Sequence, residues 1–311
     1  MKRNYSKNFS FIFVPFVCGL ISTLSLPPYN FFYLNFISFP FLLLFYLNLE
    51  IKKSFSSFIY GWIFGFTYFV SNIYWIANSL TVEEIFKPLI PFAITIIPLF
   101  LGIFYGITFL IFFYFKPRKK IESIFLFALI FSFIEYLRGH VFGGFPWNLI
   151  SFSLVEIDQF IQILSYVGTY SFNLLVVTFF LVPTVILFNV SSRAKLITIL
   201  LAVTLVVSNL IFGNLVLNKH NNTPNSPMNT IVKIISPKID LKRFFDGTDP
   251  SLVIKDLAEI GNIDNRDALY IYPEGILPSI NLNEIQDYSS VFGNYFQNNH
   301  KIIVGITRYK E

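Results

Sequence analysis

Long hydrophobic segments dominate residues 1–217 of this 311-residue chain. An α-helix needs about 20 predominantly apolar residues to cross a bilayer, and runs such as Phe9–Leu26 and Leu196–Leu217 approach or reach that length. The hydrophobic pattern predicts segments with approximate limits at 9–26, 31–49, 55–80, 88–115, 121–137, 160–189 and 196–217. We therefore expect a polytopic α-helical membrane bundle of about seven spans.

The pattern changes after residue 217. Residues 218–229 form a polar linker interrupted by Pro224 and Pro227. Beyond it, short apolar runs typical of strands alternate with stretches typical of helices. The predicted order is a strand at 231–235, a helix at 251–260, a strand at 268–272, a helix at 283–297 and a strand at 301–307. This order predicts a helix-covered sheet in residues 230–311. We expect that domain to be incomplete, because about 80 residues are few for a stable core.

Composition supports a membrane protein. Hydrophobic residues make up 54% of the chain and charged residues only 13%, whereas soluble domains carry about 25% charged residues. The net charge of +5 does not imply a nucleic-acid partner, because the Lys and Arg residues cluster between the hydrophobic segments.

The loops on the two sides of the predicted bundle differ in Lys and Arg content. One side carries 11 of these residues, namely Lys2, Arg3, Lys7, Lys52, Lys53, Lys116, Arg118, Lys119, Lys120, Arg193 and Lys195. The other side carries 2, Lys87 and Arg138. The positive-inside rule places the N-terminus in the cytoplasm, and seven crossings then place the residues after 218 outside. We expect the first segment to remain as a span, since no cleavable signal pattern precedes it.

Glu274 is the first candidate functional residue. The apolar run 268–272 predicts a buried strand, and Pro273 ends it because proline cannot donate to a sheet ladder. Glu274 would then lie at the carboxyl end of the strand, where α/β proteins collect catalytic groups. Partial desolvation there would suit a general base. The alternative is an ordinary solvated glutamate that begins a loop.

A second candidate is the loop between the fifth and sixth segments, which runs from Glu135 through Gly143 and Gly144 to Phe145 and Trp147. A tryptophan suits the membrane interface. Arg138 could pair with Glu135, three residues earlier on the same helix face, or with a lipid phosphate. A structural ion pair with an interface anchor is an equally good interpretation.

Metal and disulfide chemistry are not expected. The chain has one cysteine, Cys18, inside the first hydrophobic segment, and its histidines, His140, His220 and His300, lie far apart in sequence. We expect neither a metal nor a cofactor.

Five short motifs, in order, resemble those of the bacterial apolipoprotein N-acyltransferases, and the resemblance covers nearly the whole chain. The motifs are Ser25–Tyr29, Gly61–Gly65, Tyr74-Trp75, Gly144–Trp147 continuing through Ser153, and Tyr272–Glu274. Two positions depart from the family pattern: Tyr272 replaces the family's tryptophan before Pro-Glu, and Ser236-Pro237 replaces a glutamine that usually ends the first strand of the soluble domain.

The resemblance implies a multi-pass enzyme of the bacterial inner membrane with a periplasmic nitrilase-like domain, an α-β-β-α sandwich of the carbon–nitrogen hydrolase type. In this family a cysteine thiolate takes an acyl chain from a phospholipid and passes it to the α-amino group of a lipoprotein's diacylglyceryl-cysteine. A glutamate acts as general base and a lysine stabilises the oxyanion. By position, Glu274 is that glutamate, and Arg138, Phe145 and Trp147 are expected to lie near the lipid.

The family's catalytic lysine and cysteine have no counterpart among the 311 residues. Lys301 and Lys310 do not lie in the lysine motif, and Cys18 lies in a hydrophobic segment, where an apolar setting suppresses the thiolate. We therefore expect this chain alone to be inactive, as a truncated product or as half of an enzyme that a second chain completes. A non-catalytic membrane module that binds lipid or a partner, and a polytopic transporter, remain as alternatives.

Overall fold

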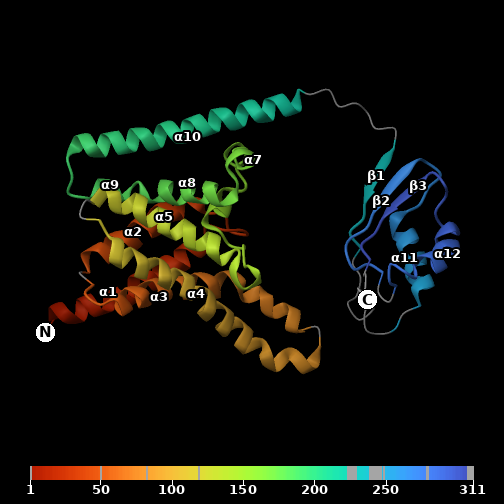
Figure 1. Ribbon diagram of the computed structural model, residues 1–311, viewed down its shortest axis with the longest axis horizontal. Coiled ribbons are helices and arrows are strands. Elements are labelled where there is room, and N and C mark those ends of the chain that lie inside the picture. The colour runs from red at the N-terminus through yellow and green to blue at the C-terminus, as the bar shows by residue number, and fades with distance from the viewer. Residues whose placement is uncertain are drawn as a thin grey trace. The chain divides into compact units, whose positions relative to one another are not determined.

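The computed structural model describes residues 2–49, 51–81, 83–117, 120–222, 230–237, 247, 249–277 and 280–306. The chain divides into two compact units, Met1–Thr223 and Pro224–Glu311, each shown in Figure 1. Most of the predicted linker, together with Arg118, Lys119, Thr307 and Lys310, lies outside the described residues.

The first unit is helical. Its longer helices are α1 (Lys2–Thr23), α2 (Asn35–Asn48), α3 (Ser54–Ile73), α4 (Ile90–Phe115), α5 (Lys120–Arg138), α8 (Thr169–Leu181) and α10 (Ser192–Asn221). Shorter helical segments join them: η1 (Phe32–Leu34), η2 (Tyr74–Thr81), η3 (Glu84–Leu89), η4 (Val141–Gly143), η5 (Ile150–Leu154), α6 (Asp158–Ile161), α7 (Leu164–Val167) and α9 (Thr184–Leu187). Among the described residues, the stretches Glu84–Phe115, Thr169–Leu187 and Ser192–Asn221 are long and apolar enough to cross a membrane.

Two of the predicted hydrophobic segments are not continuous helices. The segment at 55–80 leaves the α-helix after Ile73 and continues as the 3-10 helix η2. The segment at 160–189 is divided into α6, α7, α8 and α9. Gly168 separates α7 from α8 with a φ of +77°, and Pro183 separates α8 from α9 because it has no N–H for a helical hydrogen bond. Both breaking residues are visible in the sequence.

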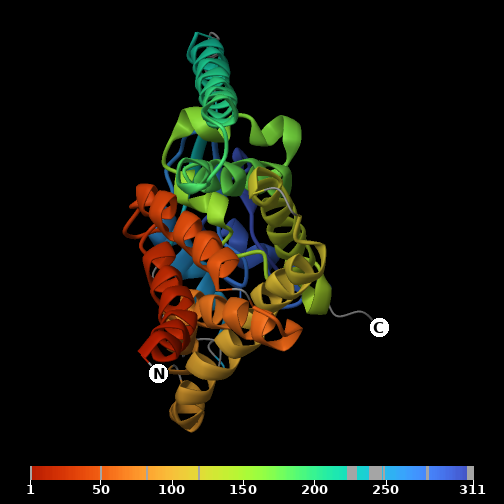
Figure 2. The same ribbon diagram turned by 90° about the vertical axis from the view of Figure 1, so that its left-hand side faces the viewer.

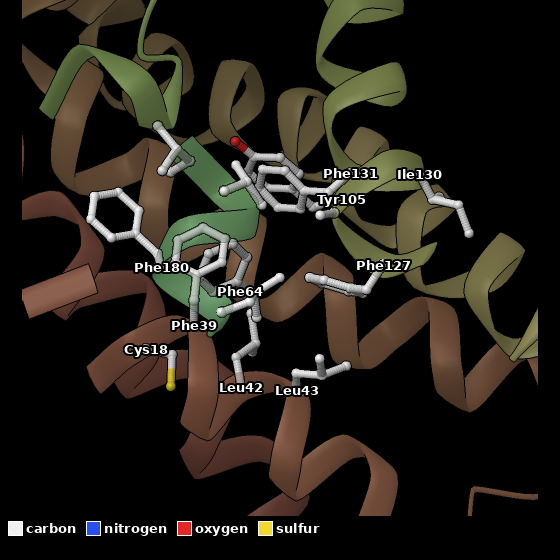
Figure 3. Packing of buried hydrophobic residues seen from close by; sticks show 14 of the residues in the cluster. Cys18, Phe39, Leu42, Leu43, Phe64, Tyr105, Phe127, Ile130, Phe131 and Phe180 are labelled. Atoms are coloured by element: carbon white, nitrogen blue, oxygen red, sulfur yellow. The ribbon is translucent and has the colours of Figure 1, made fainter. Parts of the chain in front are cut away.

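An aromatic core holds the bundle together. Phe39, Phe64 and Tyr105 are fully buried, and the rings of Tyr105 and Phe131 stack with their centroids 4.8 Å apart; Figure 3 shows these rings among the surrounding aliphatic side chains. Helices α3 and α4 pack closely where glycines face each other. A Cβ on Gly65 would lie 2.9 Å from the Cα of Gly102, as expected where small residues allow two membrane helices to approach.

Helix α10 lies apart from the other helices of its unit, as both views show (Figures 1 and 2). Only 6% of its most apolar 18-residue stretch is buried. It contacts α6, α7 and α9. Asn209 Nδ2 donates to the carbonyl oxygen of Phe160 over 3.2 Å, and Gly213 packs against the backbone of Gln159. The rings of Phe212 and Tyr166 lie 5.3 Å apart, and Lys195 Nζ donates to the carbonyl oxygen of Ile186 over 2.8 Å.

The second unit contains a small parallel sheet. Strands β1 (Ile231–Ile234), β2 (Ala268–Ile271) and β3 (His300–Ile303) pair in the order β1-β2-β3. The connections are α11 (Pro250–Gly261), between β1 and β2, and η7 (Ile285–Tyr288) with α12 (Ser289–Gly293), between β2 and β3. Both α-helices lie on the same face of the sheet (Figure 1), as sequential right-handed crossovers require. The helix predicted at 283–297 is thus two short pieces.

One face of this sheet is packed and the other is open. Ala268 and Tyr270 of β2 point into the core that α11 closes. The opposite face presents Val232, Ile234 and Ile303, which are 42%, 80% and 54% exposed. Such an apolar strip is unusual for a sheet face in contact with water.

Candidate functional site

The loop after α5 folds back onto the end of that helix. Phe142, Gly143 and Gly144 all have positive φ, at +55°, +84° and +78°. A Cβ on Gly144 would collide with the carbonyl oxygen of Gly139, so the turn needs glycine there for space as well as for conformation. The turn closes when Phe145 N donates to the carbonyl oxygen of Arg138 over 2.9 Å. Residues 145–151, the return segment, then run back against the bundle.

Arg138 holds the return segment with its side chain. Its Nη1 donates to the carbonyl oxygens of Phe145 and Trp147 over 2.6 Å and 2.9 Å. The guanidinium is buried and lies over the ring of Phe69, with Cζ 5.1 Å from the ring centroid. Backbone carbonyls of irregular structure need donors when they lie away from water, and Arg138 supplies them.

Glu135 is the charge partner of Arg138. Both side chains are inaccessible to solvent, and Arg138 Nη2 lies 3.6 Å from Glu135 Oε1. Tyr105 of α4 donates to Glu135 Oε1 over 2.8 Å, and Asn173 Nδ2 of α8 donates to Glu135 Oε2. The ion-pair interpretation of the sequence is confirmed. The structure does not support direct contact of the buried guanidinium with a lipid phosphate.

Two further hydrogen bonds fix the end of the return segment. Tyr68 of α3 donates to the carbonyl oxygen of Asn148 over 2.8 Å. Ser151 N donates to Asn173 Oδ1 over 3.0 Å. The segment is therefore tied to α3, α5 and α8. We name Tyr68, Tyr105, Glu135, Arg138 and Asn173 the buried polar cluster.

The return segment presents an aromatic surface. Trp147 stacks on Trp75 of η2 with the ring centroids 5.2 Å apart and the planes at 22°. Phe145 contacts Trp147 at 5.4 Å. Trp75 and Trp147 remain 44% and 48% exposed. The structure thus brings together the Trp75 and Trp147 motifs, which lie about 70 residues apart in sequence, because the return segment packs against η2.

Glu274 lies in the second unit, in a turn just beyond β2. Tyr272 N still donates to the carbonyl oxygen of Ile303 over 2.9 Å, and Gly275 has a φ of +68°. Tyr272 and Ile276 are buried on either side, so the turn is anchored at both ends. The Glu274 side chain is exposed, as in the interpretation of a solvated glutamate that begins a loop, and the described residues do not desolvate it. Its position at the carboxyl end of the strand agrees with the sequence.

Sequence reasoning missed Tyr68, Tyr105 and Asn173. Asn173 left a signal, because an amide inside an apolar segment needs hydrogen-bond partners in a bilayer. The two tyrosines left none, since the chain has 17 tyrosines and only tertiary packing selects these two.

A bundle of apolar helices with a buried ion pair, followed by a parallel α/β unit, defines a membrane-type protein. Residues 18–182 match the model of the apolipoprotein N-acyltransferase N-terminal domain. The chain belongs to the apolipoprotein N-acyltransferase family, which is a family of acyltransferases.

Curated relatives match most of the chain. Apolipoprotein N-acyltransferase of Rhizobium meliloti (strain 1021) is 27% identical over 96% of this chain and 58% of its own length. The protein of the same name from Sinorhizobium medicae (strain WSM419) is 30% identical over 86% of this chain and 52% of its own length. That of Brucella melitensis biotype 1 is 26% identical over 94% and 57%. The chain therefore spans little more than half the length of these relatives.

Proposed function

We propose that this chain supplies the membrane bundle and the first part of the catalytic domain of a lipoprotein N-acyltransferase. The reaction would move a fatty acyl group from a phospholipid to the amino group of the diacylglyceryl-cysteine at a lipoprotein's N-terminus. The observation that carries the proposal is the alignment of 96% of the chain with a relative named apolipoprotein N-acyltransferase. No metal or cofactor takes part in this reaction.

Glu274 is the proposed general base. Its place beyond the carboxyl end of β2 and its exposed side chain suit a group that must reach a nucleophile directly or through one water. The nucleophilic cysteine and the oxyanion-stabilising lysine would come from sequence that aligns with the rest of the relatives' length or from a second chain. The exposed apolar face of the sheet supports a nitrilase-like α-β-β-α sandwich, in which a second sheet would cover Val232, Ile234 and Ile303.

The proposed topology has seven spans in the bacterial inner membrane, with the N-terminus cytoplasmic and the second unit periplasmic. The 11-to-2 distribution of Lys and Arg supports it. Phe145 and Trp147 are the proposed lipid-contacting residues. Arg138 would lie close to the lipid because it donates hydrogen bonds to the backbone carbonyls of both. A transporter has less support, because the buried acidic and basic side chains among the described residues, Glu135 and Arg138, pair with each other.

A chimera tests this function. Residues 1–311 would replace the aligned part of the Rhizobium meliloti relative, and the chimera would be expressed in cells depleted of their own N-acyltransferase. We expect N-acylated lipoproteins by mass spectrometry. Glu274→Gln in the chimera should lower the transfer rate at least about 100-fold, the scale of a lost general base.

Glu259→Gln is the matched control. Glu259 lies exposed on α11 and contacts Lys255 at 3.8 Å, so the change should leave transfer intact. A chimera that folds and binds phospholipid but never acylates would favour the non-catalytic alternative. Equal activity of the Glu274→Gln and unsubstituted chimeras would remove Glu274 from the mechanism.

A further inference from the structure

We propose that the buried polar cluster is a positioning device, which fixes the return segment so that Trp147 stacks on Trp75 to form a rigid aromatic surface for a phospholipid. Arg138 is the central positioning residue. The use of the surface by a phospholipid rests on the proposed function, whereas the positioning of the tryptophan pair does not.

Arg138 fixes the backbone of the return segment at two points. One nitrogen, Nη1, serves both Phe145 and Trp147 carbonyls, so the residues on either side of Pro146 are held by the same group. The planar guanidinium keeps its nitrogens in a fixed fork, whereas a lysine ammonium ends a flexible stem. A lysine at this position would not hold the two carbonyls in the same geometry.

The other members of the buried polar cluster hold the Arg138 side chain in place. Arg138 is placed by Glu135, which is itself held by Tyr105 and Asn173. These groups come from α4, α5 and α8, so the position of the guanidinium is set by the packing of the bundle. Rigid helices thereby determine the position of an otherwise irregular loop, which is the arrangement that a precise binding surface needs.

The tryptophan pair is exposed enough to contact a lipid. Two stacked indoles that are nearly half exposed are not part of the bundle core. Indole rings are apolar over most of their surface and donate one hydrogen bond, so they suit the glycerol and headgroup level of a bilayer. Stacking prevents each ring from turning independently and reduces the side-chain entropy lost on binding a lipid.

The tryptophan content makes the test direct. The chain has three tryptophans, and Trp62 lies elsewhere, donating Nε1–H to the carbonyl oxygen of Leu99 over 3.0 Å. Stacked indoles give an exciton couplet in circular dichroism. In the full chain in phosphatidylethanolamine–phosphatidylglycerol nanodiscs, Trp75→Phe and Trp147→Phe should each abolish the couplet, and Trp62→Phe should leave it. A couplet that survives Trp75→Phe would overturn the stacked surface.

Arg138→Lys is the decisive variant. We expect loss of most of the couplet with the helical signal retained; a retained couplet would overturn the proposal. If Arg138→Lys instead loses its helical signal, Tyr68→Phe decides, because it removes only the hydrogen bond to the Asn148 carbonyl. We expect Tyr68→Phe to weaken the couplet in a folded protein, and an unchanged couplet would contradict the role of the cluster.

Lipid contact has its own readout. In the Trp62→Phe background, nanodiscs with brominated acyl chains should quench the pair, and Arg138→Lys should reduce the quenching. No quenching in the unsubstituted pair would overturn lipid contact. In the chimera, Arg138→Lys should lower acyl transfer by about tenfold or more, as misplaced binding groups do. A chimera inactive without any substitution would refute the proposed function while leaving the couplet result valid.

Discussion

Arg138 donates a hydrogen bond of 2.9 Å to the backbone carbonyl of Trp147, nine residues further along the chain. The guanidinium that makes this bond is buried beside the Glu135 carboxylate. The bond therefore joins a charged group of the bundle interior to a residue whose ring reaches the surface, and stability and surface geometry depend on the same side chain.

The ion pair should respond differently to single and double substitution. Glu135→Ala leaves Arg138 buried without its carboxylate and should destabilise the bundle by about 3–5 kcal/mol. Arg138→Met loses the hydrogen bonds to the Phe145 and Trp147 carbonyls and leaves the Glu135 carboxylate buried without its cation. Glu135→Gln with Arg138→Met loses the same hydrogen bonds but leaves no buried charge, so it should cost clearly less than Arg138→Met alone. Unfolding in detergent, followed by helical circular dichroism, measures each variant. Equal losses in Arg138→Met and the double variant would contradict a buried, coupled pair.

Gly143 and Gly144 form a matched pair for the turn. Both have positive φ, so alanine at either should cost about 1–2 kcal/mol in backbone strain. At Gly144 the new Cβ would also meet the Gly139 carbonyl, whereas at Gly143 nothing lies within 4 Å. Gly144→Ala should therefore be the more destabilising substitution in thermal unfolding. The reverse order would show that the turn differs from the structure.

Much of this arrangement could be predicted from sequence, and the remainder could not for identifiable reasons. The strand ending before Glu274 and the Glu135–Arg138 pair follow from local rules of pattern and spacing. The contributions of Tyr105 and Asn173 do not, because residues from separate helices meet only through packing. Local pattern left a partly desolvated and a solvated Glu274 both open, since burial depends on what covers the end of the strand, and the structure has the side chain exposed.

The orientation of α10 tests the proposed topology. A phosphatase reporter fused after His220, at the end of α10, should be active because we expect that end in the periplasm. The same reporter fused after Ser192, at the start of the same helix, should be inactive. Activity of the His220 fusion alone would agree with the proposed topology. Activity of the Ser192 fusion alone would show that the topology is inverted.

Asp264 should make the α/β unit sensitive to acid. Hydrogen bonds from the Arg266 side chain, the shortest 2.7 Å, hold the pKa of Asp264 well below its usual range. A group with a lowered folded pKa stabilises above its unfolded value, near pH 4, and loses this contribution as pH falls through the folded value.

Asp264→Asn should therefore lower the free energy of unfolding of the second unit at neutral pH. The difference in this free energy between the variant and the unsubstituted chain should become smaller below about pH 4. Arg266→Gln, which removes the main cause of the shift, should shrink the difference at neutral pH. Urea unfolding followed by pulse proteolysis, with pepsin as the protease at acid pH, measures it. A difference that widens on acidification would contradict the assignment.

We propose that Glu274 is the base of an acyl transfer whose nucleophilic cysteine is not among residues 1–311. Intact-mass measurement of purified proteins mixed with phospholipid tests it most directly. The chimera should gain the mass of one acyl group, the Glu274→Gln chimera should gain it far more slowly, and residues 1–311 alone should gain none. An acyl adduct on residues 1–311, or full acylation of the Glu274→Gln chimera, would contradict the account.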